Sequence, residues 1–195
     1  MSKRSVGGRI YLETDRLVLR VLTAADADNL FDLDSDPDVM RYLNNGRTHT
    51  RKEIVERVLP HYLDHYARYG DRYGFWAAIE KPRGDFIGWF HLRPFRDAPE
   101  EIELGYRLKR SSWGKGYATE GCRALIQKGF VELGIDKIVA DTLARNVRSR
   151  RVMEALGMTL EAEFTLDANE FPEWNAEERR GVKYALTRAE WMAMP

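Results

Sequence analysis

The stretch EIELGYRLKRSSWGKGYATEG, residues 101–121, leads from one secondary-structure pattern into another. Apolar and polar side chains alternate over residues 101–108, which predicts a strand. Residues 118–133 carry apolar side chains at helical spacing, which predicts a helix. Gly114 and Gly116 lie between the two patterns. The sequence therefore predicts a strand–loop–helix junction, a place where proteins can hold phosphate groups.

The composition of this loop suits an anion. The first four N–H groups of a helix have no intrahelical partner and carry partial positive charge. Glycines allow a phosphate to approach the backbone without a Cβ in the way. Arg107, Lys109, Arg110 and Lys115 add positive charge around the junction. On spacing alone, phosphate binding and a solvated, glycine-eased turn are equally good interpretations, because short glycine motifs are weak evidence.

Two better-known phosphate motifs do not match this loop. A P-loop requires Ser or Thr after Gly-Lys, and here Gly114-Lys115 is followed by Gly116. A dinucleotide-binding loop requires three spaced glycines and an acid at the end of the next strand, and only two glycines are usefully placed. An enzyme that uses nucleoside triphosphates is therefore disfavoured.

The rest of the chain predicts a mixed sheet with helices packed on it. Two strand patterns flank the turn KPRGD and indicate a hairpin, and a strand–helix–strand unit surrounds the glycine loop. This order is typical of an α/β or α+β fold. Strands are predicted over residues 16–22, 75–80, 86–92, 101–108, 137–143, 158–164 and 181–187.

Capping residues mark the predicted helix ends. Thr followed three residues later by Glu forms a capping box, and Gly just past a helix forms a C-cap. Pro60 predicts a kink in the long helix that follows Thr50. The predicted caps are Thr23, the Thr50/Glu53 box, Gly70, Gly134, Asn146, Gly157 and the Thr187/Glu190 box.

Length and composition indicate a single folded domain over residues 1–195. Apolar residues make up 44% and charged residues 32%, and the formal net charge is zero. This balance gives no reason to expect nucleic acid or a membrane as partner, and no apolar run approaches the roughly 20 residues that cross a bilayer. Cys122 is the single cysteine, so we expect no internal disulfide and a cytoplasmic location.

Taken together, these segments resemble the GNAT acyltransferases, and within them the group that acetylates the N-termini of ribosomal proteins. The resemblance runs from Thr14 to about Trp191, the expected domain core. It implies a mixed, mostly antiparallel seven-stranded sheet with helices on both faces, whose fourth and fifth strands are parallel and splayed. The segments that carry it are TDRLVLRVLTAADADNL, FIGWFHL, the opening stretch, ARNVRSRRVMEALGM and VKYALTRAEW.

The resemblance implies acetyl-CoA as the second substrate and assigns residues to it. The loop Trp113, Gly114, Lys115, Gly116, Tyr117 and Ala118 would grip the pyrophosphate through backbone N–H groups. The end of the preceding strand, Tyr106, Arg107 and Leu108, would pair with the pantetheine arm, and so would Asn146 of an Asn-x-x-Ser motif. The family pattern starts with Gln or Arg three residues before the first glycine, and this chain has Ser111 there.

The resemblance also implies direct attack of a neutral amine on the thioester, without a covalent enzyme intermediate. Two strand carboxylates, Glu103 and Asp141, are candidates for the general base. The alternation places Glu103 on the strand face opposite to Ile102 and Leu104. Each carboxylate is equally compatible with a solvated or salt-bridged position on its strand. Ser149 would lie near the thioester sulfur, and it or a water would replace the Tyr acid of some relatives, where this chain has Met153.

The acceptor stays open between a protein N-terminus and a small-molecule amine, because a fold does not select a substrate. A non-catalytic acyl-CoA sensor or partner-binding module is the alternative function. Relatives are often homodimers. His61 and His65 share a helix face without an evident third ligand, so no metal is expected. Cys122 and Glu120 are expected to be structural.

Overall fold

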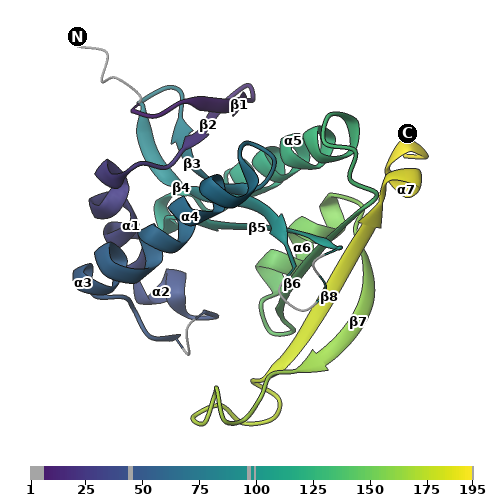
Figure 1. Ribbon diagram of the computed structural model, residues 1–195. Coiled ribbons are helices and arrows are strands. Elements are labelled where there is room, and N and C mark those ends of the chain that lie inside the picture. Colours follow the sequence, from purple (N-terminus) through teal and green to yellow (C-terminus); the bar gives the residue numbers. More distant parts are fainter. Residues whose placement is uncertain (1–6, 44–45, 96–97, 99, 195) are drawn as a thin grey trace.

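The computed structural model describes residues 7–43, 46–95, 98 and 100–194. Within them, eight strands form one sheet in the order β1-β2-β3-β4-β5-β6-β8-β7 (Figure 1). All neighbouring strands are antiparallel except β5 and β6. The strands are β1 (Ile10–Glu13), β2 (Leu17–Val21), β3 (Gly74–Glu80), β4 (Asp85–Pro94), β5 (Ile102–Leu108), β6 (Lys137–Leu143), β7 (Thr159–Thr165) and β8 (Arg180–Thr187).

The strand count corrects the prediction of seven. The additional strand β1 is four residues long, lies at the edge of the sheet and contains an irregularity in its pairing with β2. Its Ile10 is 49% exposed, so the segment lacks the half-buried alternation of a longer strand. The Tyr11 ring stacks on Trp76 of β3 at a centroid distance of 4.0 Å. This long-range aromatic contact helps to fix β1, and its partner cannot be identified from local sequence.

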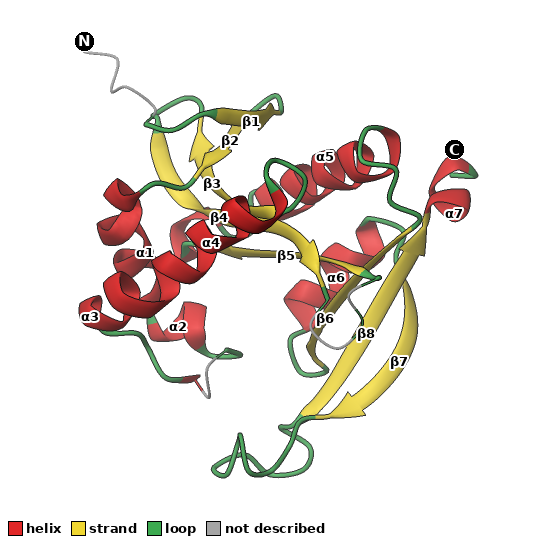
Figure 2. Ribbon diagram, viewed as in Figure 1, coloured by secondary structure: helices red, strands yellow, loops and turns green. Residues whose placement is uncertain are grey.

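Helices cover both faces of the sheet, as predicted (Figure 2). One core cluster packs the sheet against α1, α2 and α4, and we call this side the α1–α4 face. The other cluster packs the sheet against α5 and α6, on the α5–α6 face. None of the described helices combines the length and apolarity needed to cross a membrane. The helices are α1 (Ala27–Asp34), α2 (Pro37–Met40), α3 (Arg51–Glu53), α4 (Leu59–Tyr69), α5 (Tyr117–Val131), α6 (Val147–Ala155) and α7 (Arg188–Met192).

The predicted caps position these helices. The boxes Thr50/Glu53 and Thr187/Glu190 are both formed, and the Asn146 side chain accepts from the Ser149 N–H at α6. A π-helical turn over Ile54–Val58 precedes Pro60, which lies in the first turn of α4, where its missing N–H costs little. Helix α5 ends before Gly134, so that glycine serves the following turn rather than the cap itself.

Strands β5 and β6 part soon after they meet. Their parallel pairing consists of Ile102 opposite Ile138 and Glu103 opposite Val139. Beyond Glu103, no further pairs join the two strands within the described residues. The predicted splay of two parallel central strands is therefore present. We call the place where β5 and β6 separate, beyond Glu103 and Val139, the opening.

Candidate active site

The glycine loop leaves the start of α5 open. Gly114 and Gly116 have φ of +72° and +81°, a backbone conformation that residues with a side chain rarely adopt. Gly116 is the N-cap of α5, and no side chain caps that helix end. Open space surrounds the position of an added Cβ at Gly114. The first N–H groups of α5 are thus placed to bind an anion.

Contacts from the first part of the chain hold this loop in place. Glu120 accepts hydrogen bonds from Thr14 Oγ1 at 2.5 Å and from Arg16 Nε at 2.6 Å. The Arg16 guanidinium also donates to the Lys115 carbonyl at 2.9 Å and lies 4.7 Å from the centre of the Tyr117 ring. Glu120 therefore has a structural role, as expected, and fixes the loop through Arg16.

Most of the basic side chains near the loop are paired with acids of α1 and α2. This corrects the expectation that they add their charge to the junction, because each neighbouring acid offsets it. Of the four basic residues around the junction, Lys115 remains as an exposed cation beside the backbone N–H groups of the loop. The pairs are Arg107 with Asp34 at 2.6 Å, Lys109 with Asp32 at 3.9 Å, and Arg110 with Asp38 at 2.5 Å.

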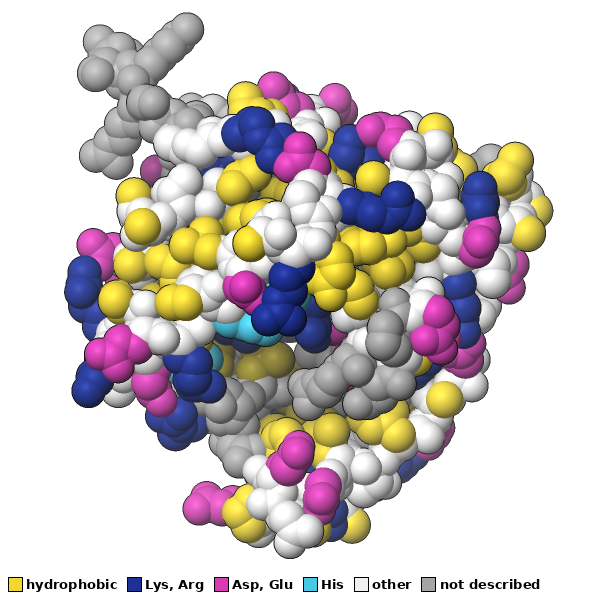
Figure 3. All heavy atoms as spheres, in the orientation of Figure 1, with side chains coloured by type: hydrophobic (Ala, Val, Ile, Leu, Met, Phe, Trp, Pro, Cys, Tyr) yellow, Lys and Arg dark blue, Asp and Glu magenta, His cyan; other side chains and the backbone are white. Residues whose placement is uncertain are grey.

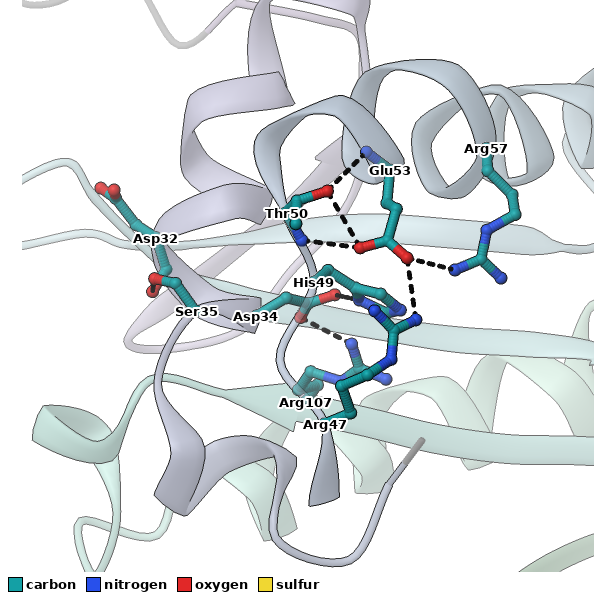
Figure 4. A network of polar contacts seen from close by, with 9 residues as sticks. All are labelled: Asp32, Asp34, Ser35, Arg47, His49, Thr50, Glu53, Arg57 and Arg107. Atoms are coloured by element: carbon teal, nitrogen blue, oxygen red, sulfur yellow. Dashed lines mark hydrogen bonds and ion pairs between the residues drawn. The ribbon is translucent and has the colours of Figure 1, made fainter. Parts of the chain in front are cut away.

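The Asp34 pair belongs to a buried polar network on the α1–α4 face (Figure 4). Asp34 is fully buried, and its second oxygen lies 2.9 Å from His49 Nδ1. Arg107 also lies over the Trp89 ring, 5.0 Å from its centre. The network joins α1, the segment before α3, and two central strands. It was not predicted, since Arg107 and Asp34 are 73 residues apart in sequence.

Glu103 lies at the point where β5 and β6 part. Its side chain is on the α1–α4 face, opposite to Ile102 and Leu104, as the alternation predicted. The residue is only 8% exposed. Its carboxylate is bracketed by two residues of β4: Arg93 Nη2 is 2.6 Å from Oε2, and His91 Nε2 is 3.4 Å from Oε1. A buried carboxylate with these partners is held in one orientation.

Asp141, the second candidate base, is in a different environment. It lies on β6 beyond the last pair with β5, opposite Lys183 of β8. The register places it on the same side of the sheet as Glu103, two residues after Val139. Asp141 is exposed, whereas Glu103 is buried. The two carboxylates thus flank the opening from opposite strands.

The Asn-x-x-Ser motif begins helix α6 on the other side of the opening. The Asn146 side chain accepts from the Ser149 N–H at 3.3 Å and donates to Thr142 Oγ1 at 3.0 Å, so capping occupies much of it. Burial raises the pKa of the Tyr106 phenol, and a hydrogen bond to Ser149 opposes this. Ser149 therefore contacts the end of β5, while Met153 is buried in the core.

Trp113 links the loop to both sides of the opening. Its indole Nε1 donates to the Leu108 carbonyl at 2.8 Å, at the end of β5. The Arg148 guanidinium of α6 lies over the same ring, 5.0 Å from its centre. The structure thus brings together the predicted loop, the end of β5 and the start of α6.

The remaining polar candidates have no metal-site geometry. No group of three or more His, Cys, Asp or Glu side chains suitable for a metal is found in the described part of the chain. His61 and His65 of α4 pack against each other and against Phe75. Histidine side chains are visible in a hollow beside Lys and Arg side chains (Figure 3). Cys122 is buried in the α5–α6 core, and burial raises the pKa of its thiol.

The chain is similar to known proteins in both sequence and fold. The family description "Acetyltransferase (GNAT) domain" matches residues 16–159. The chain is 32% identical to the FsC-acetyl coenzyme A-N(2)-transacetylase of Aspergillus fumigatus, over 94% of this chain and 78% of that protein. It is 34% identical to the uncharacterized protein YkkB of Bacillus subtilis, over 75% of this chain and 84% of that protein.

A solved structure shares the whole fold. The acetyltransferase (GNAT family) from Bacillus anthracis superimposes with a TM-score of 0.74 at 24% sequence identity, covering 92% of this chain and 99% of that one. At this identity the likeness shows the fold. The similarity in sequence rests on the family match and on the Aspergillus relative.

Proposed function

The chain belongs to the GNAT acetyltransferase family and is an N-acetyltransferase, and we propose that it transfers the acetyl group of acetyl-CoA to a primary amine by direct attack, with Glu103 as the general base. The observation that carries this proposal is the place of Glu103. Its buried carboxylate lies on the α1–α4 face, at the last residue of β5 that pairs with β6. A family member would bring thioester and amine together there.

The residues of the opening fit coenzyme A. The uncapped start of α5 offers N–H groups to the pyrophosphate, with Gly114 and Gly116 leaving space for it. The edge of β5 from Tyr106 to Leu108 has no pairing with β6 and is suited to the amides of the pantetheine arm. Acetyl-CoA, when bound, supplies an activated acyl group whose thiolate is a good leaving group.

The chain's own groups would then handle charge and protons. A backbone N–H of β5 facing the opening would stabilise the oxyanion, because a fixed donor in a water-poor site acts most strongly on developing charge. Glu103 would remove a proton from the amine, directly or through a water. Ser149, which hydrogen-bonds Tyr106 at the end of β5, or a water would donate a proton to the leaving sulfur.

Glu103 is preferred to Asp141 for a physical reason. A buried carboxylate with fixed partners keeps its geometry between turnovers, and geometry is the first requirement of a general base. Asp141 is exposed on the strand across the opening and is better suited to attract a cationic acceptor.

A small-molecule amine is the acceptor class that we propose first. The name of the Aspergillus relative describes acetyl transfer from acetyl coenzyme A to an N(2) position, and that relative matches most of this chain. A protein N-terminus, as in the ribosomal-protein subgroup, is the competing acceptor. We further propose a cytoplasmic location, a single domain over residues 1–195 and a homodimer.

The first experiment is a calorimetric titration of the purified protein with acetyl-CoA, with ATP as control. Saturable binding of acetyl-CoA alone supports the cofactor assignment. Thiol release is then measured with small primary amines and with peptides that have a free N-terminal alanine. Turnover with the small amines alone supports the proposal, and turnover with the peptides alone overturns the acceptor class. Binding without turnover of any amine would favour the non-catalytic sensor.

A further inference from the structure

His91 is a buried imidazole beside the proposed base. It is 5% exposed, and its Nδ1 has no hydrogen-bond partner within residues 7–43, 46–95, 98 and 100–194. Its Nε2 also has no hydrogen-bond partner among these residues and lies 3.4 Å from Glu103 Oε1. Buried polar atoms are nearly always hydrogen-bonded, so an imidazole placed in this way needs an explanation.

The neighbouring strand leaves room for this ring. Gly105 lies opposite His91 in the β4–β5 register. A Cβ at Gly105 would lie 2.5 Å from His91 Nε2, closer than side-chain atoms approach one another. Phe75 and Trp89 pack against the ring at centroid distances of 5.0 and 5.6 Å. Packing thus holds the imidazole against Glu103 where hydrogen bonds do not.

Burial, and to a smaller extent the nearby cationic groups, disfavour the charged form of this ring. Burial lowers the pKa of His91, and the Glu103 carboxylate opposes this shift. Arg93 of β4 and His65 of α4 also disfavour a charged imidazole, and His61 of α4 lies beside His65. A neutral imidazole in contact with an ionised carboxylate titrates as a pair, and the pair binds one proton more readily than the carboxylate alone.

We propose that His91 is a positioning residue that acts through Glu103, so that the two side chains accept the proton of the acceptor amine together, shared between Glu103 Oε1 and His91 Nε2. The inference rests on the proposed function and deepens it. Arg93 alone would stabilise the ionised carboxylate and make it a weaker base. The imidazole on the other oxygen restores the affinity for a proton.

The protons of the reaction balance with this role. An acceptor ammonium carries three protons, and the amide product keeps one of them. One goes to the sulfur as the C–S bond breaks and the N–C bond forms, without oxidation or reduction. The third is taken up by the Glu103–His91 pair before attack and is released to solvent afterwards.

The kinetic test compares His91→Gln and His91→Phe with the native protein. The Gln amide can donate to Glu103 but cannot take up a proton, and Phe keeps the ring shape alone. Both variants should lower kcat at least about tenfold at neutral pH, with the KM for acetyl-CoA nearly unchanged. The acid limb of the kcat/KM profile should move to lower pH by about one unit, because the carboxylate then titrates without the imidazole.

The matched control is His61→Gln, on the outer part of α4, which should leave rate and profile unchanged. A uniform loss of rate in the His91 variants without movement of the acid limb overturns the proposal, since a structural defect acts equally at every pH. Full activity of His91→Gln also overturns it, because that side chain cannot carry the proton.

A measurement without turnover separates this inference from the proposed function. The four histidines are labelled with ¹⁵N in the full chain, and the His91 signals are identified by their loss in His91→Gln. Replacing Glu103 by Gln should lower the titration midpoint of His91, because a negative charge next to the imidazole is lost. An unchanged midpoint overturns the pairing even if the enzyme is active. A lowered midpoint supports the pairing even if no amine is acetylated.

Discussion

The glycine loop and the α1–α4 face are built in different ways, although they meet at the same opening. The loop is one continuous stretch, residues 113–118, and it presents backbone N–H groups at the start of α5. The α1–α4 face brings together side chains from α1, β4, β5 and the segment before α3. A site made of backbone can be recognised in a short sequence motif. A site made of distant side chains depends on the whole fold.

The largest expected effect is on catalysis by the α1–α4 face, the part of the site that is made of side chains. Glu103→Gln should lower kcat by about 10²–10⁴-fold, because the amide keeps the size of the side chain and loses its basicity. The dissociation constant for acetyl-CoA should change by less than about twofold. Thiol release measures the first quantity and calorimetry the second.

Asp141→Asn is the matched variant on the opposite strand. It removes an exposed carboxylate from the same side of the sheet, and its effect should fall mainly on the KM for a cationic acceptor. If Asp141→Asn loses more kcat than Glu103→Gln, the base is on β6, and the buried carboxylate has a structural role instead.

The second effect concerns the stability of the α1–α4 face. Asp34→Ala should lower the free energy of unfolding by about 3–5 kcal/mol, because it leaves the buried Arg107 guanidinium and His49 without their shared acid. Urea unfolding followed by tryptophan fluorescence measures this loss. Asp38→Ala, which removes the exposed partner of Arg110, is the control and should hardly move the midpoint. Equal losses in both variants would mean that burial of Asp34 does not decide its contribution.

The fold was predictable in the parts that local sequence determines. Capping boxes such as Thr50/Glu53 and Thr187/Glu190 need only residues three apart, and both are formed. The splayed pair β5 and β6 followed from the family resemblance and is present. Strand β1 was missed because it is short and partly exposed, and because the stacking of Tyr11 on Trp76 that helps to fix it joins residues far apart in the chain.

The third effect concerns the glycine loop, the part of the site that binds through backbone N–H groups. Gly114→Asp should weaken acetyl-CoA binding by about 10–100-fold, because a negative charge enters the space where the pyrophosphate would lie and the left-handed backbone is lost or strained. Calorimetric titration measures the change. Gly114 is well suited to this test because no neighbouring atom blocks a side chain there.

Gly134→Asp is the control for backbone strain. Its φ of +65° is close to the +72° of Gly114, and open space surrounds it as well. It lies after the opposite end of α5, so it should lose a similar amount of stability and keep its affinity for acetyl-CoA. A loss of affinity in both variants would mean that Gly114→Asp acts through stability and not through the phosphate.

In the candidate site, too, the features that depend on local sequence were predictable and those that depend on the whole sheet were not. Spacing and alternation predicted the positions of Gly114, Gly116 and Asn146 and the face of Glu103. Each of these features depends only on its own strand, loop or helix end. The partners of Glu103 were not readable. His91 and Arg93 reach it only because β4 and β5 pair in one register, and that register depends on the complete sheet.

The smallest expected effect, that of Arg110→Ala on the affinity for acetyl-CoA, tests most directly whether the glycine loop binds through its backbone alone. Arg110→Ala should change the affinity for acetyl-CoA by less than about threefold, because the guanidinium pairs with Asp38 and the phosphate contacts come from the backbone. The measurement is again calorimetric, at two salt concentrations, since a direct phosphate contact weakens with added salt. A loss of tenfold or more, reduced at high salt, would mean that Arg110 leaves Asp38 when the cofactor binds. The loop would then use side chains as the α1–α4 face does, and Arg110 would supply the contact that the family resemblance implies for the position of Ser111.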